Sequence, residues 1–206
     1  MTLDLLVLML SYLPANEAQA LFENCLSKEI LESRDNAVQK RGYKILAKLM
    51  EGGKVSVDAQ AVIEKLDNFL DGLSPAAKKD RFTLLGQLVA QIPSNNLHLI
   101  PSIIPEAVLG TKEPSEKART AAFDLVVAMG RKMSEGGVVR RDQVDGMDES
   151  TAGEAAASIE EYMTMVAGGL AGATPHMISA TVTAVSRLVF EFRGALRLYL
   201  VCPSLC

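Results

Sequence analysis

Basic side chains gather at the openings of three predicted helices, where they could bind phosphate groups. The set comprises Lys40, Arg41 and Lys44, then Lys78, Lys79 and Arg81, and finally Lys112, Lys117 and Arg119. If the three helices are equivalent members of stacked repeats, these positions align as a ladder of positive charge along one edge. Such a ladder would attract phosphates or an acidic protein surface. The alternative is the solvated face of ordinary amphipathic helices, and no aromatic side chains alternate with the charges to stack on bases.

Other residue types that perform chemistry are poorly placed for it. His98 and His176 lie in different predicted repeats, and neither is followed at three or four positions by a metal-ligating side chain. Glu160 and Glu161 are adjacent on a predicted helix, so their carboxylates point apart. The odd number of cysteines favours a reducing compartment over a disulfide framework: Cys25, Cys202 and Cys206. We therefore predict a protein that is not an enzyme and that needs no metal or cofactor.

The elements that carry these residues follow a repeated pattern. Four helix-capping residues, Asp35, Ser74, Ser115 and Thr174, lie 39, 41 and 59 residues apart. Each is followed after three, eight, eleven and fourteen positions by an apolar residue, which keeps one face of a helix apolar. The matching positions are Val38, Tyr43, Leu46 and Leu49; Ala77, Phe82, Leu85 and Leu88; Ala118, Phe123, Val126 and Met129; Met177, Val182, Val185 and Leu188. A period of about 40 residues is typical of HEAT and armadillo solenoids.

The predicted fold is therefore all-α, a HEAT/armadillo-like solenoid of about four helical hairpins plus an extra N-terminal helix. We expect that first helix over Leu3–Leu13, and then hairpins pairing 17–31 with 36–50, 57–71 with 75–91, 97–109 with 116–132, and 155–170 with 175–192. Asn16 is the expected cap of the second helix. Pro101 and Pro105 leave open whether the helix over 97–109 begins properly only at Pro105, because each proline removes a hydrogen-bond donor.

One insertion accounts for the long last interval between caps. Residues 1–193 read as the helical-repeat segment, and within it residues 134–153 form a polar, glycine-containing insertion. The acids around this insertion dominate the net charge of −4, so the overall charge says little about partners. A tolerated surface insertion is favoured over a partner-binding loop. Both ends lack the polar face of a capping repeat, so we expect an internal segment of a longer protein.

Two apolar stretches imitate membrane signals without matching them. Leu5–Leu10 has no basic residue before it, and the uncharged stretch over 162–186 contains Gly168, Gly172 and Pro175. Glycine and proline at these positions favour a turn between two helices, the fourth hairpin, over a membrane span. No membrane partner is expected.

The third repeat carries a more specific pattern than its periodicity. Residues 103–113, IIPEAVLGTKE, precede EKAR at 116–119 and AFDLVVAMG at 122–130. This segment resembles the ribosomal-RNA-processing protein twelve family, karyopherin-like HEAT-repeat factors of eukaryotic ribosome assembly. Residues 38–46, 165–181 and 187–192 are similar to the same family, so that the resemblance covers roughly 21–193. Residues 194–206 depart from it and form an atypical C-terminal tail, which could come from a mis-spliced gene model.

The resemblance implies a function as well as a fold. It implies a non-enzymatic scaffold in ribosome biogenesis that serves pre-rRNA processing and the nuclear export of pre-ribosomal subunits. The implied partners are pre-ribosomal RNA and assembly factors, with Ran GTPase and nuclear-pore proteins as further ones, and the implied location is the nucleus and nucleolus with shuttling to the cytoplasm. No motif of the family assigns individual RNA-contacting residues. The alternative function is a generic HEAT-repeat protein-binding adaptor, such as a karyopherin-like transport factor or a phosphatase scaffold.

Overall fold

A computed structural model of the protein describes residues 2–140, 154–172 and 174–195. The chain divides into two compact units, Met1–Gln91 (the N-terminal unit) and Ile92–Cys206 (the C-terminal unit). Each is built from helices packed in pairs, which confirms the predicted all-α, helical-repeat class. Within the described part of the chain, no helix combines the length and the apolar character needed to cross a membrane.

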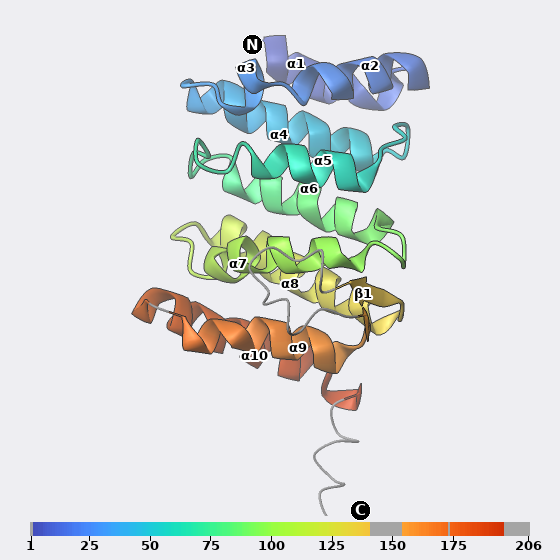
Figure 1. Ribbon diagram of the computed structural model, residues 1–206. Coiled ribbons are helices and arrows are strands. Elements are labelled where there is room, and N and C mark those ends of the chain that lie inside the picture. The colour runs from blue at the N-terminus through green and yellow to red at the C-terminus, as the bar shows by residue number, and fades with distance from the viewer. Residues whose placement is uncertain (1, 141–153, 173, 196–206) are drawn as a thin grey trace, which may run out of the picture. The chain divides into compact units, whose positions relative to one another are not determined.

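The N-terminal unit is organised around one central helix, α4. Its elements are α1 (Thr2–Met9), the 3₁₀ turn η1 (Leu10–Tyr12), α2 (Ala15–Cys25), α3 (Lys28–Leu31), α4 (Asn36–Glu51), α5 (Ala59–Asp67) and α6 (Lys78–Gln91). Helices α1, α2 and α3 all pack on α4, and α4 packs along α6, with which it runs side by side in Figure 1. The core between them includes Leu46, Leu49, Leu85 and Leu88, the predicted apolar positions of the first two repeats.

A buried glutamine aligns the first turns of α4 and α6. Gln39 is fully buried on α4, where its Nε2 donates to the carbonyl oxygens of Leu31 and Gly72, at 2.8 Å each. Its Oε1 accepts from the backbone N–H of Ser74 at 2.8 Å. The side chain thus joins the end of α3, the start of α4 and the segment that leads into α6. A buried amide with all these bonds made selects one register, because any shift leaves polar groups unpaired.

Several predicted boundaries in this unit are wrong. The helix expected over 17–31 starts at Ala15, so that Asn16 is not its cap, and a break at Leu26 and Ser27 divides it into α2 and α3. Helix α6 starts at Lys78, and the Ser74 hydroxyl, the expected cap, has no hydrogen-bond partner among the described residues. Ser74 instead contributes its backbone N–H, which donates to Gln39. Asp58 caps α5, a role that the repeat pattern did not predict.

The C-terminal unit holds the helices of the third and fourth repeats. Its elements are η2 (Leu97–Leu99), α7 (Ile100–Gly110), α8 (Glu116–Ser134), β1 (Val138–Arg140), β2 (Glu154–Ala156), α9 (Ile159–Ala167), η5 (Gly168–Ala171) and α10 (Pro175–Glu191). Helix α8 packs on α7 and α9, and α10 contacts all three. Pro105 lies inside α7, so the idea that this helix begins only there is wrong. Pro101 sits in the first turn, where a missing N–H breaks no intrahelical bond.

A short pair of strands, absent from the prediction, stands beside the insertion. Strands β1 and β2 are antiparallel, with Val139 opposite Ala155. Val139 is fully buried, and the N–H of Val138 donates to the carbonyl of Ser94. Strands of three residues are too short to show an alternating pattern in the sequence. Most of the predicted insertion, residues 141–153, and the tail from residue 196 onward lie outside the described residues.

The fourth repeat departs from the apolar pattern of the first three. Thr174 caps α10 as predicted, its hydroxyl accepting from the N–H of Met177 at 3.2 Å. Val182, the expected core position, is nevertheless 51% exposed. Helix α10 turns a different strip inward, made of Ala180, Thr181, Ala184 and Leu188, because its neighbours α7, α8 and α9 all contact that side. The prediction is therefore wrong at Val182; Leu188 is buried as predicted, and Met177 and Val185 are half-buried.

Leu85 and Val126 are both fully buried, as the repeat register predicts. We expect Leu85→Ala and Val126→Ala each to lower the free energy of unfolding by roughly 1–4 kcal/mol, because truncation leaves a cavity in a packed core. Urea denaturation of the purified chain measures the change. Leu70→Ala is the matched control, since Leu70 is 41% exposed. A control as destabilised as the core variants would contradict the assignment.

Candidate nucleic-acid interface

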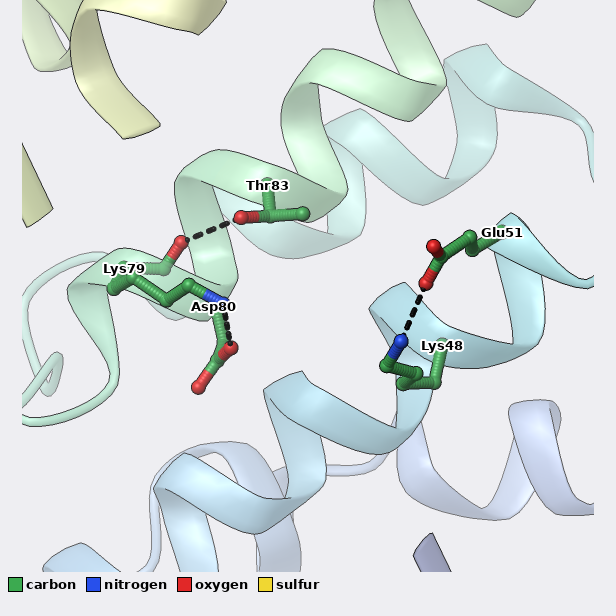
Figure 2. A network of polar contacts seen from close by, with 5 residues as sticks. All are labelled: Lys48, Glu51, Lys79, Asp80 and Thr83. Carbon is green, nitrogen blue, oxygen red and sulfur yellow. Dashed lines mark hydrogen bonds and ion pairs between the residues drawn. The ribbon is translucent and has the colours of Figure 1, made fainter. Parts of the chain in front are cut away.

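A row of three exposed lysines runs along α4. Lys40, Lys44 and Lys48 follow one another at intervals of four residues, which places them on one face of the helix. Lys48 forms an ion pair: its Nζ lies 2.7 Å from Oε2 of Glu51 (Figure 2). In the part of the chain that the structure describes, neither Lys40 nor Lys44 forms an ion pair. Lys48 was missed by the sequence analysis, although its spacing from Lys44 could have revealed it.

Lys79 on α6 contributes to the same positive field. The pKa of the Glu51 carboxyl is held below its ordinary value, first by its hydrogen bond with Lys48 and the charge of Lys48, and further by the charge of Lys79. Lys79 also pairs with Asp80, at 3.0 Å (Figure 2). We call Lys40, Lys44, Lys48 and Lys79 the α4–α6 basic face. Glu51 and Asp80 offset part of its charge, which leaves Lys40 and Lys44 as its strongest anion-binding groups.

Arg81 does not belong to this surface, contrary to the prediction. It is fully buried, and its Nη1 donates to the carbonyl oxygen of Leu66 at 2.8 Å and to Oη of Tyr43 at 3.3 Å. Its Nη2 lies 3.8 Å from Oδ1 of Asp67. The guanidinium thereby connects α4, α5 and α6. Arg81 stands four residues before Leu85 on the apolar face of α6, and this spacing could have revealed its burial.

Arg81→Ala should lower the stability of the fold without removing any exposed lysine. We expect a loss of about 2–4 kcal/mol in the free energy of unfolding, from the cavity and from the hydrogen bonds left unmade. Urea denaturation measures it, with Lys79→Ala as control. The Lys79 side chain is 47% exposed, so its removal should cost less than about 1 kcal/mol. Equal stabilities for the two variants would contradict the buried role of Arg81.

The remaining predicted residues differ in how available they are. In the N-terminal unit, Arg41 and Lys78 are half-buried, and both take part in polar contacts. In the C-terminal unit, Lys117 is exposed in the first turn of α8 and Lys112 is half-buried. Arg119 is committed to the backbone, since its Nη1 donates to the carbonyl oxygens of Glu113 and Pro114 at 2.8 Å each. The alignment of the basic residues of both units in one ladder stays a prediction.

The exposed lysines of the α4–α6 basic face suit the binding of anions. No group of three metal-ligating side chains occurs among the described residues. Burial raises the pKa of the Cys25 thiol to about 11, so at neutral pH this side chain is a poor nucleophile. Lysines on flexible stems, by contrast, neutralise phosphates without requiring a fixed geometry.

Comparison with known proteins shows which proteins the chain is similar to. The chain is 34% identical over 199 residues to ribosomal RNA-processing protein 12 of Saccharomyces cerevisiae, a match that covers 94% of the chain. It is 31% identical over 195 residues to the putative ribosomal RNA-processing protein 12 of Schizosaccharomyces pombe, covering 93% of the chain. The chain is homologous to a segment of the ribosomal RNA-processing protein 12 family.

The homology extends beyond fungi. An RRP12-like protein of Gallus gallus is 30% identical over 208 residues, covering 97% of the chain. The chain spans 16% of the length of the two fungal relatives and 14% of that of the chicken relative. The resemblance predicted from residues 103–130 is therefore confirmed over nearly the whole chain. No protein-family model matches the chain.

Proposed function

We propose that this chain acts in ribosome biogenesis as a non-enzymatic scaffold that serves pre-rRNA processing and the nuclear export of pre-ribosomal subunits. The observation that carries the proposal is homology, over 94% of the chain, to a protein named for ribosomal RNA processing. The helical hairpins of both units support it, because repeat proteins of this kind offer long surfaces to large partners.

The proposed partners follow from this role. Pre-ribosomal RNA and assembly factors come first, and they place the protein in the nucleus and nucleolus. Ran GTPase and nuclear-pore proteins join them if the same scaffold accompanies subunits through the pore and shuttles to the cytoplasm. Of these partners, RNA carries the charge that a basic helix face would meet, because every nucleotide of its backbone bears a phosphate.

Within the N-terminal unit, the α4–α6 basic face is the proposed RNA contact. Lys40 and Lys44 are exposed and form no ion pair among the described residues, whereas Lys48 pairs with Glu51 and Lys79 with Asp80. Phosphates can therefore approach Lys40 and Lys44 without breaking an ion pair. Lysines bind the sugar-phosphate backbone, which every RNA sequence shares. We therefore expect tolerance of RNA sequence and strong dependence on salt. Lys117 of the C-terminal unit, and with it Lys112 and Arg119, extends the proposed contact.

Charge reversal tests the proposed contact. Lys40→Glu with Lys44→Glu should weaken binding of a single-stranded pre-rRNA fragment and reduce the salt slope by about 0.7 for each phosphate that the protein no longer neutralises. Fluorescence anisotropy at several salt concentrations measures both quantities. The matched control is Lys28→Glu with Lys65→Glu, which makes the same charge change on exposed residues of α3 and α5. Arg81 is left intact, so that folding is preserved.

If both double variants weaken RNA binding equally, net charge alone is responsible and the α4–α6 basic face is not the contact. If neither does, the RNA contact lies elsewhere or is absent.

The scaffold role itself is tested in cells. The protein is tagged at its own locus, and the RNA and proteins that co-purify with it are identified. Recovery of pre-rRNA with assembly factors supports the proposal. Recovery of Ran with cargo proteins and no RNA would instead establish the generic transport adaptor.

A further inference from the structure

A pocket with an apolar floor and a basic rim opens on the N-terminal unit. Its volume is about 420 Å³, which is within the range of pockets that bind ligands. It lies between α1–η1 and the second half of α4, and we call it the α1–α4 pocket. Its lining combines aliphatic side chains with three lysines: Val7, Leu8, Leu10 and Leu49, then Lys44, Lys48 and Lys54, with Ser11, Glu51 and Gly52.

Lys54 holds the two sides of the pocket together. Its Nζ donates to the carbonyl oxygens of Ser11 and Leu13, at 2.6 and 2.9 Å, and so ties the end of η1 to the segment after α4. The single carboxylate of the lining, Glu51, is paired with Lys48 (Figure 2). Lys44, which has no ion pair among the described residues, is therefore the lining's open positive charge.

An exposed apolar row extends the pocket along α1 and η1. Leu5, Leu8, Met9 and Tyr12 are 59%, 73%, 50% and 84% exposed. Positions 5, 8, 9 and 12 follow the pattern i, i+3, i+4, i+7, which places the four side chains along one side of the helix. Leu8 belongs both to this row and to the pocket lining. Contiguous exposed apolar surface with a charged rim marks an interaction site.

We propose that the α1–α4 pocket and the apolar row dock an acidic amphipathic helix of a partner protein. Apolar side chains at the spacing i, i+3 or i+4, i+7 would enter the pocket and cover Leu5, Leu8 and Tyr12, as in other helix-in-groove complexes. Carboxylates beside that apolar stripe meet Lys44, with Lys48 next to it. The charge of the lining selects an acidic helix over a basic one.

RNA fits this site less well than a peptide. Of the pocket's lining, only the lysine rim suits a phosphate backbone, and the aliphatic floor holds no aromatic ring. The adjacent row offers one ring for a base to stack on, that of Tyr12, beside three aliphatic side chains. The proposal thus adds a protein-binding surface to the proposed RNA-binding role and does not depend on it.

The experiment uses a fluorescein-labelled helical peptide of about 18 residues, with leucines at i, i+3 and i+7 and glutamates beside them. It is titrated with the 206-residue chain and followed by anisotropy. Leu8→Glu should weaken binding at least about tenfold, because it places a charge in the apolar contact. Leu70→Glu is the matched control: Leu70 is exposed on the same unit but outside the pocket, and binding should be unchanged.

Exchanging the charges of the pocket rim and the peptide tests whether Lys44 contacts the peptide. Lys44→Glu should weaken binding of the acidic peptide and strengthen binding of a peptide whose glutamates are replaced by lysines. Leu8→Ala adds no charge beside Lys44 and Lys48, so it should weaken peptide binding and leave RNA binding unaltered. This test and that of the RNA contact can therefore fail independently. Equal binding of the acidic peptide by the unaltered chain, Leu8→Glu and Leu70→Glu would overturn the proposal.

Other occupants give distinct results. A single-stranded RNA that displaces the peptide, and whose own binding is weakened by the uncharged change Leu8→Ala, would assign the pocket to RNA. A dimer of the chain in sedimentation that dissociates with Leu8→Glu would assign it to a second copy.

The peptide is also tested on a chimera in which this chain replaces the aligned segment of the Saccharomyces cerevisiae relative. Loss of binding there would show that neighbouring sequence covers the pocket. Each of these results would overturn the proposal.

Discussion

The positions of the surface lysines in the N-terminal unit depend on how α4 and α6 are aligned along their axes. Two buried polar side chains set that alignment. Gln39 bonds to the backbone just before α6, and Arg81 reaches back from α6 to Tyr43, four residues further along α4. The two contacts advance in the same direction along both helices, so the helices run parallel. Apolar packing tolerates sliding by small steps, whereas satisfied buried hydrogen bonds do not.

Helix α4 is consequently shared among three surfaces. One side packs on α6 through Tyr43 and Leu46, both fully buried. A second side, with Leu49, forms the wall of the α1–α4 pocket. The remaining side carries Lys40, Lys44 and Lys48, of which the last two also reach the pocket. The proposed phosphate-binding row and the proposed peptide-binding pocket thus share α4, and occupants of the two would compete for Lys44 and Lys48.

In the described residues of the C-terminal unit, the helices are joined by close contacts between aromatic rings and the backbone of α8. The Oη of Tyr162 on α9 donates to the carbonyl of Val126 on α8 at 2.8 Å, and burial raises the pKa of this phenol. A Cβ at Gly130 of α8 would lie 2.9 Å from the ring of Phe192 and 3.2 Å from that of Tyr162. Glycine at this position therefore lets two aromatic rings contact the backbone of α8, so α8, α9 and α10 fit tightly.

Local sequence patterns predicted much of the fold but little of the arrangement of the candidate site. The caps Asp35 and Thr174, followed by helical apolar spacing, predicted the bounds of α4 and α10 closely, because capping and amphipathicity act within a few residues. The same patterns placed Leu85 and Val126 in the core. They failed where contacts with distant segments determine the structure. Examples are the buried side of α10, the continuation of α7 through Pro105, and the two short strands.

The charged residues show the division most clearly. The sequence by itself determined that the openings of the second helices are rich in lysine and arginine, and it established the kinship with the ribosomal RNA-processing proteins. It treated Lys79 and Arg81 alike. Only the tertiary structure decided that Lys79 faces solvent while Arg81 is enclosed by Tyr43, Leu66 and Asp67. The physical reason is that a guanidinium can be buried once its donors are satisfied, and its acceptors come from helices that only folding brings together.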